Sequence, residues 1–321
     1  MKTNSSFAVL VVLVTIFGSA PAQAQFPNRP IRIIAHTAPG GAPDIAARLL
    51  ADRLTSSFGQ PIIVENKTGA NGNIAGDYVA RSAPDGYTLL LVPDSVITVN
   101  PHVYRNMSFA PLKDLVPIAS IFQNQFALTV NPNVPANTLP EFIAYARKAN
   151  PPLRYASAGP GSLHQLGIEM LKQRAGIDLV HVPYRGGAAA GTATIAGETH
   201  VVLAGAGAAG SIQSGRLRAL AITSAKRSPL FPDLPPIGDF YPGYDLTAWA
   251  GLFAPAGTPE SVVSRLHAEV HKALAERGLA QKLTKVGPQP LLLSAQEFNA
   301  LIRRDFDRYG KVVKAIGLKI E

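Results

Sequence analysis

The chain has 321 residues, of which 47% are hydrophobic, and it contains no cysteine. This length and apolar content predict about two folded domains and exclude an intrinsically disordered chain or a small disulfide-stapled fold. The absence of cysteine excludes disulfides, thiolate metal sites, a cysteine nucleophile and a lipid-modified N-terminal cysteine. The formal net charge of +9 is compatible with nucleic acid, a membrane surface or an anionic small molecule as partner.

Residues 1–24 have the pattern of a secretory signal peptide. Lys2 is their only charge, Phe7–Phe17 is apolar apart from one threonine, and an A-x-A cleavage site ends at Ala24. A buried N-terminal helix or an uncleaved anchor is the alternative. We expect cleavage after Ala24 and export of a mature chain that begins at Gln25. Export separates a protein from the cytosolic ATP and nicotinamide pools, which disfavours kinases and dehydrogenases.

From Pro30 onward, short β-branched runs alternate with segments of helical period, which is typical of an α/β protein with mainly parallel sheets. The predicted strands are Ile31–Ala35, Pro61–Glu65, Tyr87–Val92, Phe126–Val130, Arg154–Ala158, Leu179–Pro183, His200–Ala204, Leu217–Thr223 and Ala248–Phe253. The predicted helices are Asp44–Phe58, Asn73–Arg81, Thr138–Ala149, Leu163–Ala175, Gly187–Ala196, one begun by Thr258-Pro259-Glu260 and one from Ser294 to Ile316. About ten strands exceed the usual width of one sheet. Two lobes are therefore predicted, with one large sheet and an appendage as the alternative.

Several predicted helix ends carry capping signals. Asp44 is placed to cap the start of the first helix, and Gly59 to end it. Thr138 precedes Glu141 by three residues, and Ser294 stands in the same relation to Glu297, which is the spacing of a capping box.

Turns of small residues precede four of the predicted helices. They are Ala38–Gly41, Gly69–Gly72, Ser157–Ser162 and Arg185–Gly187. A helix N-terminus presents unpaired N–H groups and a partial positive charge, and glycine lets an anion approach the backbone closely. Any single turn of this kind is commonly only a tight turn. Four in one chain favour a site for a carboxylate or a phosphate.

Other motifs argue against competing functions. The G-x-G-x-x-G at Gly205–Gly210 is followed too closely by Gly215 for the long helix that dinucleotide binding requires. The chain has no P-loop and no G-x-S-x-G. Ser162 and His164 lie on one helical turn and point in different directions, so they cannot act as nucleophile and base to each other.

Metal and nucleic-acid binding are also not expected. His267 and His271 have zinc-compatible spacing, but no third ligand accompanies them, so a solvated helix surface is the preferred interpretation. Lys and Arg are scattered over many elements without interleaved aromatic residues, which disfavours nucleic-acid binding.

A series of segments in fixed order resembles one receptor family. They are Pro30–Ile34, Pro39–Arg48, Gly72–Ile74, Ala83–Leu90, Asn100-Pro101, Tyr155–Ser162 with His164, His181–Gly187, Leu217–Ser224 with Lys226–Pro229, and Gly251–Pro259. In these segments the mature chain is similar to the extracytoplasmic solute-binding receptors of the tripartite tricarboxylate transporter system, the Bug or TctC family. The resemblance covers essentially the whole mature length.

The resemblance implies a Venus-flytrap fold, in which two α/β lobes, each a mainly parallel sheet flanked by helices, are joined by two crossing strands. By similarity, lobe 1 holds residues 25–125 and 245–321, and lobe 2 holds residues 126–244. The implied protein is a periplasmic monomer that captures a small carboxylate and passes it to inner-membrane transporter subunits. It implies no catalytic activity, cofactor, metal or nucleic-acid partner.

The resemblance also implies a ligand site between backbone amides of the two lobes. The implied residues are Thr37, Ala38, Gly40, Gly41, Ala42, Asp44 and Ser95 in lobe 1, and Ser157, Ala158, Gly159, Ser162, His164, Tyr184 and Arg185 in lobe 2. Arg185 is expected to pair with a second anionic group, and His164 to act as a neutral donor or pH-sensitive contact. The alternatives are an exposed loop residue for Arg185 and a backbone-contacting residue for His164.

The chain departs from the family pattern at three places. It has His36-Thr37-Ala38 where a Pro-aromatic-Pro segment is usual, Ala189 where proline is common, and small residues throughout Leu203–Ala209. We therefore expect a ligand other than an amino acid, such as an aromatic or longer aliphatic carboxylate. Two other functions stay open: a periplasmic hydrolase of anionic esters with Ser157 or Ser162 as nucleophile, and an orphan receptor that signals to a sensor kinase.

Overall fold

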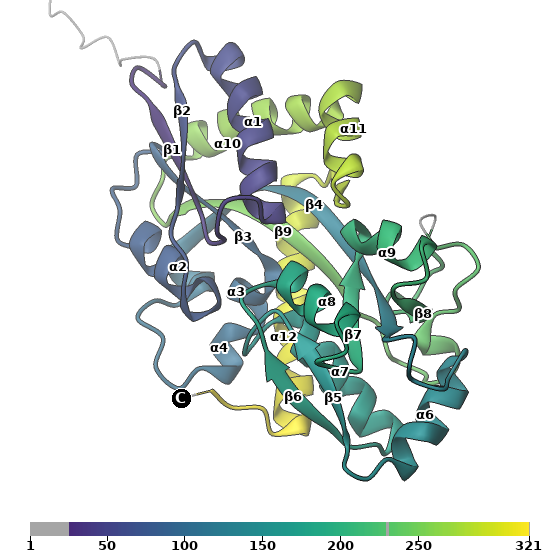
Figure 1. Ribbon diagram of the computed structural model, residues 1–321. Helices are drawn as coiled ribbons and strands as arrows, with labels where there is room; N and C mark the ends of the chain where they lie inside the picture. The colour runs from purple at the N-terminus through teal and green to yellow at the C-terminus, as the bar shows by residue number, and fades with distance from the viewer. Residues whose placement is uncertain (1–25, 229–230, 321) are drawn as a thin grey trace, which may run out of the picture.

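The computed structural model in Figure 1 describes residues 26–228 and 231–320; the predicted signal peptide at residues 1–24 lies outside this range. The strands form one curled sheet in the order β2-β1-β3-β9-β4-β7-β5-β6, and β8 and β10 also pair with β4. Helices pack around each end of this sheet, so that the molecule has two lobes (Figure 1). The predicted α/β class and two-lobed fold are confirmed.

The first lobe is built around three parallel strands, which alternate with helices along the chain. Its strands are β1 (Ile31–Ala35), β2 (Ile62–Asn66) and β3 (Thr88–Pro93). Its helices are α1 (Ala42–Phe58), α2 (Asn73–Ala80), α3 (Asp94–Thr98), α4 (Asn100–Val103), α5 (Pro111–Asp114), α10 (Glu260–Ala275) and α11 (Arg277–Lys285), and a 3-10 turn, η1, covers Ala70–Gly72.

The second lobe repeats this arrangement. Its parallel strands are β5 (Leu153–Ser157), β6 (Leu179–Pro183) and β7 (Val201–Gly205), and β8 (Arg218–Ile222) adds an antiparallel pairing. Its helices are α6 (Leu139–Lys148), α7 (Leu163–Ala175), α8 (Gly187–Ile195) and α9 (Ala209–Gln213), and 3-10 turns cover Ala206–Ala208 and Ile237–Asp239.

Two antiparallel strands connect the lobes. β4 (Leu115–Val130) pairs with β9 (Thr247–Pro255) along its first part and with β7 and β8 over its last five residues. The short β10 (Gln289–Pro290) pairs with the middle of β4. After β8 the chain returns to the first lobe through β9, which pairs with β3 on its other side. The strand predicted at Phe126–Val130 is therefore the second-lobe end of a longer crossing strand.

Helix α12 (Ala295–Ile316) packs on the hydrophobic cores of both lobes. Phe298 and Ile302 belong to the cluster beneath β3 and α3, whereas Tyr309 and Val313 belong to the large cluster of the second lobe. In Figure 1 this helix runs behind the junction between the lobes. Helix α12 thus contributes side chains to the hydrophobic cores of both lobes.

Two predicted caps need correction. Helix α1 begins at Ala42 with Gly41 as its N-cap, and Asp44 lies inside the first turn instead of capping it. Thr138 caps α6 as predicted, but the Glu141 carboxylate accepts from Asn137 N at 2.8 Å, so a reciprocal box does not form there. The box at Ser294 is complete. Pro43 near the start of α1 explains the earlier start, because its fixed φ suits a first helical turn.

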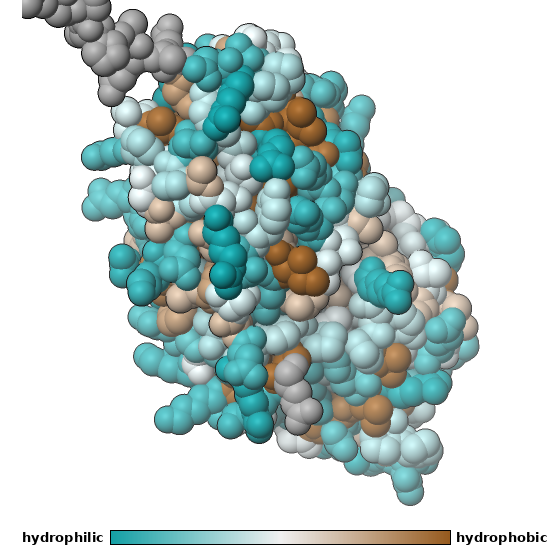
Figure 2. All heavy atoms as spheres, turned by 90° about the vertical axis from the view of Figure 1, so that its left-hand side faces the viewer, coloured by the Kyte–Doolittle hydropathy of each residue, from teal (hydrophilic) through white to brown (hydrophobic). Residues whose placement is uncertain are grey.

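The face of the molecule drawn in Figure 2 is mainly hydrophilic. The face in Figure 2 shows hydrophobic side chains scattered singly among polar ones. Among residues 26–228 and 231–320, no helix has the length and hydropathy needed to cross a membrane.

Candidate anion-binding site

The loop after β1 is held by a buried carboxylate at the start of α1. Asp44 is only 2% exposed, and its Oδ2 accepts from Gly40 N at 2.9 Å. Asn66 at the end of β2 donates from Nδ2 both to Asp44 Oδ1 and to Thr37 O, each at 2.8 Å. Gly41 N donates to Ala38 O at 3.1 Å and closes the turn. The loop is therefore fixed with its amides at the N-terminus of a long helix.

Asp44 stays ionised because its hydrogen bonds outweigh its burial. Desolvation by itself would raise its pKa, but donors from Arg48, Asn66 and Gly40 lower it, and the net direction is down. Arg48 Nη2 lies 2.9 Å from Asp44 Oδ1. Asp44 is thus placed in the predicted site as a residue that organises the loop, with its charge already neutralised by Arg48.

Two polar atoms at the start of this loop have no hydrogen-bond partner among the described residues. They are His36 Nδ1 and Thr37 Oγ1, and both atoms are buried. Burial lowers the pKa of His36 to about 4, with a backbone contact to Leu91 acting in the opposite direction. A Cβ on Gly72 would lie 3.2 Å from the His36 ring, so the 69–72 turn packs directly against this loop.

Ser95 lies beside the same loops at the start of α3. It is 3% exposed, and its backbone N–H donates to the Oδ1 of Asp94 at 2.9 Å. The other oxygen of Asp94 is buried without a partner, and burial followed by repulsion from Asp305 raises the Asp94 pKa well above its usual range. This shift favours the neutral form of Asp94, which lies next to the predicted site.

The second-lobe loop between β5 and α7 is turned toward its own helix start. Ser162 caps α7, because its Oγ accepts from Gln165 N at 3.4 Å, and the same hydroxyl donates to Gly159 O at 2.6 Å. Ser157 is fully buried, and Ala158 between them is half-buried. The predicted loop residues are thus assembled around the N-terminus of α7.

The loop before α8 lies against this one. A Cβ on Gly159 would be 3.6 Å from Tyr184 O, and one on Gly187 would be 3.1 Å from His164 Nε2. Tyr184 donates its hydroxyl proton to Glu198 at 3.1 Å, so it faces its own lobe. Arg185 is exposed and has no hydrogen bond or ion pair with any described residue.

His164 packs its ring on Phe126, with centroids 4.7 Å apart, and makes no hydrogen bond to a described residue. Burial lowers its pKa to about 4, so the imidazole is neutral at physiological pH. It stands between the N-termini of α7 and α8.

Loops from the two lobes meet at an asparagine pair that sequence patterns did not reveal. A Cβ on Gly161 of lobe 2 would lie 3.3 Å from Asn100 Oδ1 and 3.4 Å from Asn71 Nδ2 of lobe 1. Asn71 Nδ2 donates to Asn100 Oδ1 at 2.8 Å, and Asn100 Nδ2 donates to Asn73 Oδ1 at 2.6 Å. Asn71 has a positive φ of 48°, which asparagine tolerates in turns. The asparagine inside the Gly69–Gly72 turn was therefore the sequence signal available for this pair.

A serine–histidine pair in the second lobe bears on the hydrolase alternative. Ser157 Oγ lies 2.6 Å from His181 Nε2. However, Ser157 is 0% exposed and its Oγ also accepts from Gly159 N at 3.1 Å. No carboxylate bonds to His181 Nδ1, whose neighbour is the amide of Gln165 at 3.3 Å. This arrangement lacks the orienting carboxylate and the accessible hydroxyl of a catalytic triad.

The Gly205–Gly210 motif and His267 take part in local structure. Gly205–Gly210 leads into a 3-10 turn and the five-residue α9, not into a long helix. His267 Nδ1 lies 2.8 Å from Ile118 O. No group of three or more His, Asp or Glu among the described residues could hold a metal.

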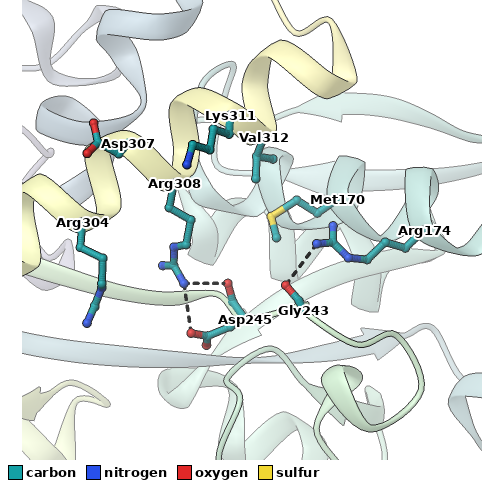
Figure 3. Close-up of a pocket in the computed structure, with 9 residues that line it drawn as sticks. All are labelled: Met170, Arg174, Gly243, Asp245, Arg304, Asp307, Arg308, Lys311 and Val312. Atoms are coloured by element: carbon teal, nitrogen blue, oxygen red, sulfur yellow. Dashed lines mark hydrogen bonds and ion pairs between the residues drawn. The ribbon is translucent and has the colours of Figure 1, made fainter.

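A cavity between α7 and α12 lies away from these loops. Its volume is about 460 Å³, and Figure 3 shows α7 and α12 on its sides with the 243–245 segment between them. Arg308 pairs with Asp245 there, and Arg174 donates to Gly243 O. None of the predicted site residues lines it.

Comparisons with known proteins agree with this architecture. Residues 46–318 match the model of the tripartite tricarboxylate transporter family receptor. The chain is 31% identical to Protein BugT of Bordetella pertussis over the whole of both chains.

Two solved structures are also similar. Rpa4515 of R. palustris, solved with adipate, is 32% identical with a TM-score of 0.85, and the match covers 92% of this chain and 99% of that one. MatC from Rhodopseudomonas palustris, with bound malate, is 30% identical with a TM-score of 0.81 over 90% of this chain and 100% of that one. The chain therefore belongs to the Bug, or TctC, family of solute-binding receptors of the tripartite tricarboxylate transporter system.

Proposed function

We propose that this chain is a periplasmic receptor that binds a small organic carboxylate between its lobes. The observation that carries the proposal is the meeting of glycine-rich loops at helix starts: the loops before α7 and α8 lie together in lobe 2, Gly161 contacts Asn71 in the 69–72 turn of lobe 1, and that turn packs on the loop before α1 through Gly72 and His36. First-turn amides have no intrahelical acceptor, and they carry the positive end of the helix dipole. Such amides suit a carboxylate without a charged side chain.

The charges near these loops disfavour an amino-acid ligand. An α-ammonium group would need a free carboxylate, but Asp44 is bonded to Arg48, Asn66 and Gly40, and burial favours the neutral form of Asp94. Arg185 is exposed without a partner and is suited to a second carboxylate. We therefore propose an aliphatic dicarboxylate or an aromatic carboxylate as ligand. The adipate and malate in the two similar structures support the chemical class.

The proposed mechanism is lobe closure. The first lobe would be residues 25–125 with 245–321, and the second 126–244, with β4 and the segment entering β9 bending between them. A ligand that contacts amides of both lobes makes more contacts in the closed state than in the open state. This difference in binding free energy shifts the population toward the closed state. The closed receptor would then deliver the carboxylate to transporter subunits of the inner membrane, as the family name indicates. An orphan receptor that serves a sensor kinase would use the same binding step.

A ligand screen tests this proposal. Thermal unfolding of the mature chain would be recorded with mono-, di- and tricarboxylates, including adipate, malate and benzoate, and with aspartate and glutamate. We expect at least one carboxylate to raise the Tm, because ligand at 100 times its Kd adds about 2.7 kcal/mol to stability. Stabilisation by the acidic amino acids alone would refute the ligand class. Turnover of an anionic ester by the same sample would refute the receptor role.

A further inference from the structure

The proposed carboxylate loop of the second lobe is held by side chains that lie beneath it. Gly159 N donates to Ser157 Oγ at 3.1 Å, and Gly161 N donates to Gln165 Oε1 at 2.9 Å. Ser157 is 0% exposed and Gln165 is 7% exposed. The direction of both loop amides therefore depends on where these two buried side chains are held.

One imidazole joins the two side chains. His181 on β6 places Nε2 2.6 Å from Ser157 Oγ and Nδ1 3.3 Å from Gln165 Nε2. Among residues 26–228 and 231–320, β6 is the edge strand of the sheet and pairs only with β5, which carries Ser157. His181 thus bridges the last residue of β5 and the first turn of α7.

The hydrogen bonds select one tautomer of this imidazole. Because the Gln165 carbonyl oxygen accepts from Gly161 N, its NH2 group is the part that faces His181 Nδ1. An NH2 group only donates, so Nδ1 must accept, and the ring proton must sit on Nε2. Nε2–H then donates to Ser157 Oγ, whose own proton is directed to Gly159 O at 3.3 Å.

A second proton on the ring would break this arrangement. Nδ1–H would oppose the Gln165 NH2, and rotation of that amide to relieve the conflict would take its carbonyl oxygen away from Gly161 N. The charged groups around His181 come from α7: Glu169 favours the protonated ring and Lys172 opposes it. The Tyr155 ring of β5 stacks on His181 at 4.9 Å and donates its hydroxyl proton to Glu169 at 2.6 Å. Burial is the largest influence, and it lowers the pKa of His181.

We propose that His181 and Gln165 are positioning residues of the carboxylate site: neutral His181 locks Gln165 in the orientation that holds the 159–161 loop in place at the start of α7, and protonation of His181 releases this loop. This inference rests on the proposed function for the identity of the ligand. It makes carboxylate capture sensitive to acid through a residue that the ligand does not touch.

The lock can be measured without a ligand. In the isotope-labelled mature chain, imidazole ¹⁵N shifts report the tautomer and pKa of His181, and amide protection factors report the loop, between pH 4 and pH 8. We expect the Nε2–H tautomer near neutrality and a loss of protection at Gly159 and Gly161 as His181 protonates. An Nδ1–H tautomer, or protection at Gly161 that does not change through the titration, would overturn the proposal.

Gln165→Glu tests the mechanism, because a carboxylate can accept from Gly161 N and from Nδ1–H at once. We expect this variant to raise the pKa of His181 and to keep Gly161 protected in acid. Gln173→Glu places the same charge on the exposed face of α7 and should behave as wild type. Equal effects of the two substitutions would show a general charge effect and overturn the proposal.

Adipate, the ligand in the similar Rpa4515 structure, serves as the binding probe. We expect its affinity to fall about tenfold at one pH unit below the pKa of His181, as single-proton linkage requires. An adipate affinity that does not change as His181 is protonated would refute the positioning role and leave carboxylate binding intact. If neither adipate nor malate binds at pH 7, that result counts against the proposed function, and the loop measurements alone then decide the inference.

Discussion

At the scale of single residues, the candidate site separates into side chains that hold loops and side chains free to meet a ligand. Asp44 and Gln165 are buried, and their side-chain oxygens accept hydrogen bonds from the loop amides of Gly40 and Gly161. Arg185 is exposed, and His164 has a ring nitrogen without a hydrogen bond. Substitutions in the first group should therefore alter stability and affinity together, whereas replacement of the exposed Arg185 should alter affinity alone.

Asp44→Asn tests the first group. The substitution keeps the shape but removes the charge that Arg48 and Gly40 N stabilise, and hydrogen bonds to charged groups contribute about 1.5–3 kcal/mol. We expect urea denaturation to show a free energy of unfolding lower by about that amount, with weaker ligand binding. Asp52→Asn, on the exposed side of α1, is the matched control. If both substitutions had equally small effects, Asp44 would not be the residue that fixes the loop.

Arg185→Ala tests the second group. We expect calorimetry to show about tenfold weaker binding of a dicarboxylate, as for the loss of one charge-assisted hydrogen bond, with an unchanged Tm without ligand. Arg303→Ala removes the same charge from an exposed position on α12 and controls for net charge. Undiminished affinity for every dicarboxylate tested would remove Arg185 from the site.

At the scale of elements, how predictable a segment was depended on its length and period. Leu163–Ala175 and Leu179–Pro183 have the predicted bounds, because a clear period is bounded by a serine cap and glycine turns. The helices α3, α4 and α5 have only four or five residues, too few to show a period. Helices α3 and α4 form where α12 packs against them, and no local pattern records this contact between distant segments.

The candidate site was likewise only partly predictable from the sequence. Glycine-rich turns before helices were visible in the sequence, since each needs particular residue types in consecutive positions. The Asn71–Asn100 bond joins residues 29 positions apart, and the Ser157–His181 contact joins residues 24 apart. Such pairs arise only when β-strand order brings separate loops together. Sequence patterns therefore located the loops but not the side chains that hold them.

Glycine turns at two ends of α7 give an element-scale prediction. Gly161, with φ +77°, faces lobe 1, where a Cβ would meet Ile320 Cδ1 at 3.2 Å, whereas Gly176, with φ +61°, caps the other end and would meet nothing within 4 Å. We expect Gly176→Ala to lower the free energy of unfolding by about 1–2 kcal/mol, the strain of left-handed backbone, with unchanged affinity. Gly161→Ala should weaken carboxylate binding as well. Calorimetry with equal affinity for both variants would contradict the placement of Gly161 at the site.

At the scale of the whole molecule, acid should weaken the fold through buried neutral histidines. The pKa values of His36 and His164 are lowered from 6.5 to about 4 in the native state, so the unfolded chain takes up protons first as the pH falls. The contribution of these two histidines to the free energy of unfolding should therefore decrease between about pH 6.5 and pH 4 and level off below. Urea denaturation at stepped pH measures this slope. His164→Gln should flatten it, and an unchanged slope would show that His164 titrates normally.

The lobes act together in the proposed function, and one measurement tests that claim directly. The ¹⁵N-labelled mature chain would be titrated with the carboxylate that raises its Tm most, and the amide shifts of both lobes would be followed. We predict the largest shifts at Gly40 and Gly41 in lobe 1 and at Gly159, Gly161 and Gly187 in lobe 2, saturating with one Kd. Shifts confined to one lobe, or centred on the cavity beside Arg308 and Lys311, would contradict capture between the lobes.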